Sequence, residues 1–208
     1  MTELQPPPAG TESSSPAASA AKTDSASLAR LFLALWPAPE ESDRLREYFR
    51  QWTWPKGSTP VQADRMHLTL HFIGAVPAAH VPEIGAGLQV PIRPCELRPT
   101  QAAIWPRGIA VLQATQIPDG LAQLHADLAR ALRALGLPVE ARRFRPHLTL
   151  ARRAAGAVPP AVAPDLRWRV DAYALVESVL GHGGGYTIRQ RYGGGDTHSL
   201  QGRKNPAQ

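Results

Sequence analysis

The tetrapeptide His-Leu-Thr-Leu occurs twice in this 208-residue chain, at residues 67–70 and again at residues 147–150. Each copy lies in an apolar stretch typical of a strand, and an arginine (Arg65 or Arg145) precedes each histidine by two positions. The two copies are 80 residues apart, which is about half of the expected folded length. The repeat therefore predicts two similar lobes, each of which contributes one copy.

The spacing of the repeat indicates which side chains share a face. Side chains alternate along a strand, so His67 and Thr69 point to one side and the two leucines to the other. The same alternation applies to His147 and Thr149. If the two strands meet across a pseudo-twofold axis, two imidazoles and two hydroxyls converge in one cleft. Because the pKa of a free imidazole is about 6.5, one histidine can act as base and the other as acid, while the hydroxyls bind phosphate oxygens.

A metal site is not expected at the repeat. His67 and His71 are four residues apart, and a strand rises about 3.3 Å per residue, so their α-carbons would be about 13 Å apart. No Cys, Asp or Glu lies at ligand spacing within either copy. We therefore expect neither a metal nor another cofactor, and we expect His71 on the sheet face at the edge of the cleft.

Periodicity along the chain predicts an α+β fold with mostly antiparallel sheets around a central cleft and helices outside. Short apolar runs bounded by Pro or Gly predict strands at 30–36, 66–73, 95–105, 109–115, 147–151, 168–180 and 186–192. Apolar stripes at helical spacing predict helices at 39–51, 77–88 and 118–135. The glycine-rich run 181–185 is expected to form a flexible hairpin turn at the rim of the cleft.

The ends of the chain have a different composition. Residues 1–28 are rich in Ser, Ala and Pro and poor in large apolar side chains, so we predict a disordered tail there and another at 196–208. A single domain of two lobes is predicted at 29–195. Cys95 is the only cysteine, which excludes a disulfide within the chain. With no apolar run long enough to span a bilayer and no secretory signal in the sequence, we expect a cytoplasmic monomer that does not contact a membrane.

The charge of the chain suggests a phosphate-bearing partner. The net charge is +6, and arginine supplies 20 of the 23 basic residues. The planar guanidinium suits phosphate oxygens, although an Ala-, Arg- and Pro-rich composition also follows from a GC-rich genome. Charge alone therefore leaves open an RNA-binding module without catalysis, which the paired His and Thr residues argue against, since binding needs no matched acid and base.

These residues resemble the two-histidine (2H) phosphoesterase superfamily, and within it the RNA 2′,3′-cyclic phosphodiesterases, historically called 2′-5′ RNA ligases. The run Arg-Leu-Phe-Leu-Ala-Leu at 30–35 is similar to the opening strand of that family. The segment His-Leu-Thr-Leu-His-Phe-Ile-Gly at 67–74 resembles its first motif, and Phe-Arg-Pro-His-Leu-Thr-Leu-Ala-Arg at 144–152 resembles its second. The resemblance covers about residues 29–192.

The resemblance implies a bilobal fold and metal-independent hydrolysis of a 2′,3′-cyclic phosphate, at RNA 3′ ends or in cyclic nucleotides, to the 2′-phosphate. It assigns His67 as the proton donor to the departing 3′ oxygen and His147 as the base that activates water. Thr69 and Thr149 would bind the phosphate oxygens. Arg152 would bind substrate as well, although strict alternation turns it away from His147, so this role requires a twist or a bulge.

Two alternatives within the same chemistry stay open, namely 2′-5′ ligation of RNA and cleavage of 2′-5′ linkages. Aromatic stacking on a base is a further possibility for four tryptophans, although packing in the core or at the cleft rim is the stronger expectation for each. These are Trp52, Trp54, Trp105 and Trp168.

Overall fold

The computed structural model describes residues 27–179 and 185–194. The tail predicted at 196–208 lies outside the described residues, as do nearly all of the tail predicted at 1–28 and of the glycine run at 181–185. The strands are β1 Leu28–Leu35, β2 Thr59–Pro60, β3 Leu68–Pro77, β4 Cys95–Leu97, β5 Gln101–Trp105, β6 Ile109–Gln113, β7 His147–Arg152, β8 Trp168–Val170, β9 Ala172–Ser178 and β10 Tyr186–Gly193. The helices are α1 Pro39–Arg50, α2 Val81–Gly87 and α3 Asp119–Ala134, with single 3-10 turns at Ala63–Arg65 and Ala78–His80.

The strand order reveals the two lobes. Within the described residues the main sheet runs β10-β9-β1-β3-β7-β6-β5, with β2 paired to β7, and its strands are antiparallel. One lobe is β10-β9-β1-β3 and the other is β7-β6-β5. They join where Leu68 pairs with Leu148, which are the same position of the two tetrapeptides. A residue paired with its own equivalent is what a twofold axis requires, so the predicted fold is confirmed, with the two lobe sheets joined at the motif strands.

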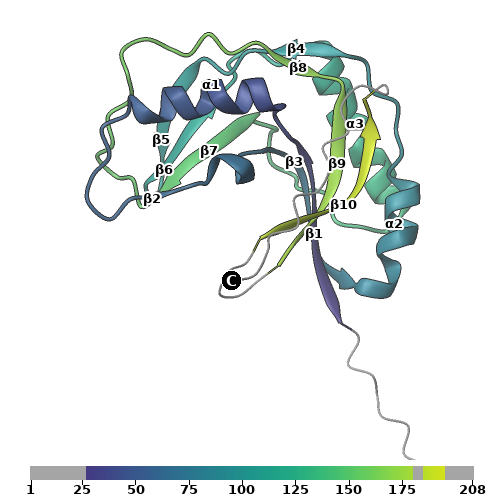
Figure 1. The fold of residues 1–208 in the computed structure, drawn as a ribbon. Helices are drawn as coiled ribbons and strands as arrows, with labels where there is room; N and C mark the ends of the chain where they lie inside the picture. The colour runs from purple at the N-terminus through teal and green to yellow at the C-terminus, as the bar shows by residue number, and fades with distance from the viewer. Residues whose placement is uncertain (1–26, 180–184, 195–208) are drawn as a thin grey trace, which may run out of the picture.

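Leucine stripes explain the helices. In α3, the four leucines Leu121, Leu124, Leu128 and Leu132 recur at intervals of three and four residues, and all are at most 1% exposed. Gly136 follows this helix with a φ of 68°, the left-handed conformation that ends many helices. In Figure 1, α1 lies in the half that holds β5, β6 and β7, whereas α2 and α3 lie in the half that holds β9 and β10. In the part of the chain that the structure describes, no helix is long and apolar enough to cross a membrane.

Three predicted elements are shorter or divided in the structure. The strand predicted at 95–105 is two strands, β4 and β5, because Pro99 cannot donate to a ladder and the chain changes partner there. Strand β4 pairs with β8 in a separate two-stranded sheet, which also divides the strand predicted at 168–180 into β8 and β9. The helix predicted at 77–88 is a 3-10 turn followed by the seven-residue α2.

Both faces of the sheet are covered around β1. The main core takes Leu31, Leu33 and Leu35 from one face of this strand. A second, smaller cluster on the other face contains Phe32, with Trp36 packed against it. Alternation in the run Arg30–Trp36 therefore separates leucines from aromatic residues, and the aromatic face is the one that borders the candidate site.

Candidate active site

The two motif strands carry the same irregularity. In the β1–β3 ladder, Ala34 pairs with Thr69 and Leu33 with His71, so Leu70 has no partner of its own. In the β6–β7 ladder, Val111 pairs with Thr149 and Ala110 with Ala151, so Leu150 is skipped in the same way. A bulge of this kind adds one residue to a strand and shifts the alternation of the side chains that follow. Both strands therefore change their alternation directly after the motif threonine.

The two motif histidines are held in the same way. The Nδ1 atom of His67 lies 2.7 Å from the backbone carbonyl oxygen of Arg65, and the Nδ1 atom of His147 lies 2.7 Å from that of Arg145. A carbonyl oxygen only accepts hydrogen bonds, so each Nδ1 must carry its hydrogen and donate. The Nε2 atom of each ring is then the nitrogen left to accept or donate a proton. The arginines that precede each motif thus orient the rings through their backbone.

Burial and nearby positive charge both lower the pKa of His67. Burial has the largest effect, the hydrogen bond to Arg65 opposes it, and the charges of His147 and Arg152 lower the pKa further. The pKa of His147 is lowered by burial and by the charge of Arg142, against the effect of its own hydrogen bond. Since each ring ordinarily titrates near pH 6.5, both are neutral at pH 7 in the free protein.

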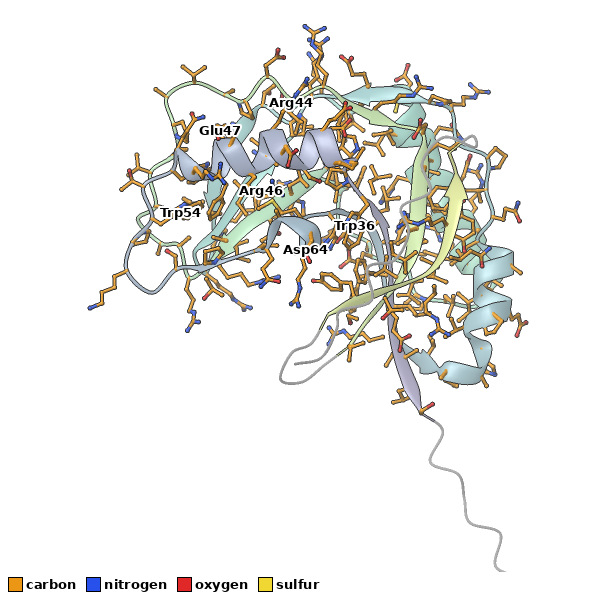
Figure 2. The ribbon with its side chains drawn as sticks, viewed as in Figure 1. Trp36, Arg44, Arg46, Glu47, Trp54 and Asp64 are labelled. Carbon is orange, nitrogen blue, oxygen red and sulfur yellow. The ribbon has the colours of Figure 1, made fainter. Side chains whose placement is uncertain are left out.

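Three aromatic rings surround His67, and the sequence analysis did not single out any of them. Trp36 stacks on the imidazole with centroids 5.0 Å apart and planes 16° apart, while Phe32 and the edge-on Tyr186 each lie 5.0 Å away. The indole Nε1 of Trp36 donates to the carbonyl oxygen of Asp64 at 3.2 Å, and Figure 2 shows these two residues next to each other. The alternation of Phe32 and Trp36 with leucines along residues 30–36 was the sequence signal for this aromatic face.

One of the four candidate tryptophans lies beside a motif histidine. The Trp105 ring is 4.3 Å from the ring of His147. Trp52 and Trp168 are buried in the core, and Trp54 stacks on Trp52 at 4.8 Å. The expectation of packing holds for these three residues, whereas Trp105 also lines a cavity at the site.

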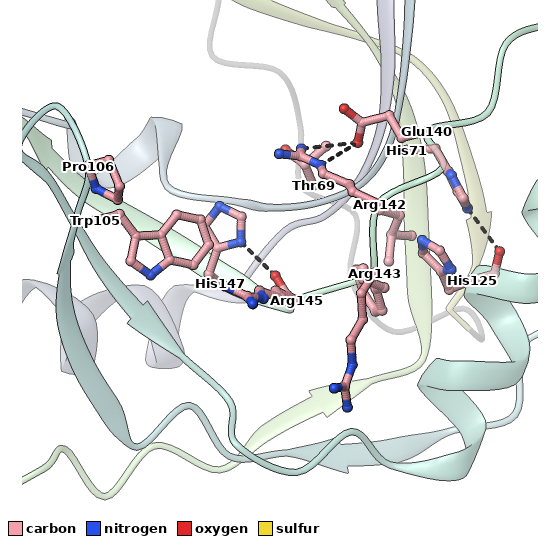
Figure 3. Close-up of a pocket in the computed structure, with 12 residues that line it drawn as sticks. Thr69, His71, Trp105, Pro106, His125, Glu140, Arg142, Arg143, Arg145 and His147 are labelled. Atoms are coloured by element: carbon pink, nitrogen blue, oxygen red, sulfur yellow. Dashed lines mark hydrogen bonds and ion pairs between the residues drawn. The ribbon is translucent and has the colours of Figure 1, made fainter.

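Two cavities flank the motifs, and Thr69 lines both of them. We call them the His67 cavity and the His147 cavity. The His67 cavity, of about 510 Å³, is lined by Arg30, Phe32, Arg65, His67, Thr69, Phe72, Arg152, Ser178, Val179, Gly185 and Tyr186. The His147 cavity, of about 370 Å³, is lined by Thr69, Leu70, His71, Trp105, Pro106, His125, Glu140, Arg142, Arg143, Phe144, Arg145 and His147, and Figure 3 shows it. Each cavity has three arginines in its wall, which makes both strongly cationic.

The structure brings Arg152 to His67. Its side chain lines the His67 cavity, and its charge lowers the pKa of His67. The bulge at Leu150 supplies the shift in alternation that this contact requires. Thr149 is half-buried, in the same pattern as Thr69, but it lines neither of the two cavities. The cavity walls therefore contain both histidines, one motif threonine and Arg152.

His71, which was expected on the sheet face at the edge of the cleft, is buried beside the site. It is only 2% exposed, because the bulge at Leu70 turns it toward α3. Its Nε2 donates to the carbonyl oxygen of His125 at 2.9 Å, and the two rings stack at 4.0 Å. The His71 side chain still lines the His147 cavity. Among the described residues, no cluster of three or more His, Cys, Asp and Glu side chains could hold a metal ion.

Comparison with known proteins matches the chain to one phosphoesterase family and to two proteins that share a name. The family model described as LigT like Phosphoesterase matches residues 35–109 and 112–182, which include both motifs. A protein of Thermus thermophilus named RNA 2′,3′-cyclic phosphodiesterase is 30% identical over 86% of this chain and 97% of its own. A protein of the same name from Escherichia coli is 36% identical over 73% of this chain and 85% of its own.

Solved structures agree with these matches. The crystal structure of E. coli LigT complexed with 3′-AMP has a TM-score of 0.70 at 27% identity, covering 80% of this chain and 98% of that one. The crystal structure of TT0787 of Thermus thermophilus has a TM-score of 0.65 at 28% identity, covering 79% of this chain and 97% of that one. The similarity therefore extends over almost the whole of each of these two solved structures.

Proposed function

The chain belongs to the LigT-like phosphoesterase family, and from this premise we propose that it hydrolyses 2′,3′-cyclic phosphates at RNA 3′ ends or in cyclic nucleotides. The relatives from T. thermophilus and E. coli bear the name of this activity and cover most of the chain. The product is the 2′-phosphate with a free 3′ hydroxyl.

The two histidines divide the proton transfers between them. The Nε2 atom of His147 takes a proton from water as the water oxygen attacks phosphorus. The bond from phosphorus to the 3′ oxygen breaks, and the Nε2 atom of protonated His67 gives its proton to that oxygen. One water is consumed, and exchange of protons with solvent restores both rings. The bound phosphate anion raises the pKa of the nearby His67, which offsets the lowering by burial and favours the acid form.

Phosphate binding is assigned to the polar groups around the histidines. Thr69 and Thr149 donate hydroxyl hydrogen bonds to the phosphate oxygens, and Arg152 adds a positive charge beside His67. The negative charge on these oxygens grows as water adds, so donors that are already in position stabilise that state more than the substrate.

The observation that carries the proposal is the matched pair of Nδ1 hydrogen bonds, both of 2.7 Å. They fix the tautomer and the orientation of both rings, and each leaves its Nε2 atom for proton transfer. A protein that only binds RNA has no need of two imidazoles held in this way.

Incubation with a 2′,3′-cyclic nucleotide and EDTA, followed by phosphorus NMR, tests the activity. We expect conversion to the 2′-monophosphate, and absence of that product would contradict the proposal. His67→Ala and His147→Ala should each lower kcat by about 10²–10⁴-fold, the range for loss of an acid or base. His80→Ala, at an exposed histidine that lines neither cavity, is the matched control and should keep full activity.

We also propose that RNA 3′ ends or cyclic nucleotides are the partners of the protein. We further propose that a single chain is the active species and that it acts in the cytoplasm. Both motifs come from a single chain, and the Cys95 thiol forms no disulfide. The molar mass of the active species in light scattering, and fractionation of cells that express the protein, test these two points.

A further inference from the structure

The His147 cavity has an apolar wall and a cationic wall. Figure 3 shows Trp105 and Pro106 on one side and Arg142 and Arg143 on the other. Arg145 also lines the cavity, beside His147, and Glu140 is the single acidic residue in the lining. The cavity therefore combines an apolar surface and an excess of positive charge next to His147.

The arginines of this wall differ in their partners. Arg142 forms an ion pair with Glu140 at 3.0 Å, so part of its charge is neutralised. Within residues 27–179 and 185–194, the side chain of Arg143 forms neither a hydrogen bond nor an ion pair. It is exposed and lines the cavity. Arg143 is thus a cation that is available to an anionic ligand.

The His67 cavity offers a different arrangement. There the guanidinium of Arg30 lies over the ring of Phe72, 4.8 Å from its centroid. The charge of Arg152 acts on His67, where the reacting phosphate is proposed to bind. In the His67 cavity, Arg30 therefore faces the aromatic wall and Arg152 faces the reacting group. Arg143 of the His147 cavity is left for a second phosphate.

A nucleotide carries the two properties that this cavity matches, namely an apolar base face and an anionic phosphodiester. We propose that the His147 cavity binds the nucleotide that precedes the cyclic end of an RNA, with its base against Trp105 and Pro106 and its phosphodiester at Arg143. This inference rests on the proposed function and adds to it a subsite for the preceding nucleotide. The enzyme then prefers oligoribonucleotide ends to cyclic mononucleotides, which lack that phosphodiester.

Two substrates distinguish binding at this subsite from hydrolysis at the reacting phosphate. They are 2′,3′-cyclic AMP, and a diadenylate that ends in a 2′,3′-cyclic phosphate. Arg143→Ala should lower kcat/KM for the dinucleotide about 10-fold and leave kcat/KM for the mononucleotide unchanged. In wild type, the logarithmic salt dependence of kcat/KM should be steeper for the dinucleotide, by about 0.7 for one additional phosphate contact to a single strand. The variant should lose this excess slope.

Arg44→Ala is the matched control, because Arg44 is an exposed arginine on α1 that lines neither cavity, and Figure 2 labels it. It should not change the ratio of the two substrates. An equal loss on both substrates in Arg143→Ala, or no loss on either, would overturn the subsite.

Failure of the proposed function would look different, because wild type would then hydrolyse neither substrate. Calorimetric titration with the 2′-phosphorylated diadenylate tests the subsite in that case. Arg143→Ala should weaken this binding about 10-fold, and unchanged affinity would overturn the subsite independently of catalysis.

Discussion

Leu68 and Leu148 meet where the two lobes join, and truncation of one of them is expected to impair both stability and catalysis. Leu68 is 1% exposed and Leu148 is 0% exposed, so Leu68→Ala leaves a cavity that solvent cannot fill. Such a change costs about 3 kcal/mol of unfolding free energy. For a domain of this size, each kcal/mol lowers Tm by roughly 2–4 °C, so we expect a decrease of about 6–12 °C.

The catalytic effect follows from the position of Leu68 directly after His67. If the strand relaxes into the cavity, the His67 ring moves relative to His147, and a displacement of about 1 Å can cost on the order of 100-fold in rate. We therefore expect kcat/KM to decrease by about 10- to 100-fold at a temperature well below the unfolding midpoint. Thermal unfolding followed by circular dichroism and hydrolysis of a 2′,3′-cyclic nucleotide give the two measurements.

Leu132→Ala is the matched control for this prediction. Leu132 is also fully buried, but it lies in α3, outside both motif strands. It should lose a similar free energy of unfolding and keep its kcat/KM. If the two variants lose equal stability and both retain wild-type kcat/KM, the reasoning that links the lobe junction to the site is wrong.

Three further predictions concern the titrating groups. Arg152→Gln removes a charge that lowers the pKa of His67. Because His67 is proposed to act as the acid, the alkaline limb of the pH profile of kcat/KM should move to higher pH. Movement of the acid limb instead would assign His67 as the base. Burial lowers the pKa of His125 to about 4, whereas its value in the unfolded chain is near 6.5. As the pH falls, the unfolded chain therefore takes up a proton at His125 before the folded protein does. Stability should therefore be complete above pH 6.5 and decrease as the pH falls toward 4, and urea titrations of His125→Asn should show a weaker dependence over that window. Trp36→Ala exposes His67 and should raise its pKa, measured by NMR titration; an unchanged value would refute burial as the cause.

Several elements of the fold were predictable because local patterns define them. The leucine stripe of α3 and the apolar runs of the motif strands match the structure closely. The repeated tetrapeptide predicted two lobes, and the Leu68–Leu148 pair confirms this. The matches to the LigT-like family confirm the resemblance that the two motifs suggested. The divided strand at 95–105 was not predicted, because the sequence of a strand does not state which partner it pairs with.

The contribution of Arg152 shows why the site was only partly predictable. Period-two alternation turned this side chain away from His147, and only the bulge at Leu150 brings it into the His67 cavity. The same shift at Leu70 buries His71 against α3, although His71 still lines the His147 cavity. A bulge arises from the pairing of two ladders that are distant in sequence, so neither tetrapeptide alone contains the information.

The sequence by itself determined the chemistry that is available to this protein, because two copies of His-Leu-Thr-Leu specify which polar side chains share a face with which histidine. The tertiary structure determined what surrounds that chemistry. It packed Phe32, Trp36 and Tyr186 around His67 and Trp105 against His147, and it divided the arginines between two cavities. The physical reason is that alternation within a strand is local, whereas the pKa of an imidazole and the partners of an arginine depend on residues far away in the sequence.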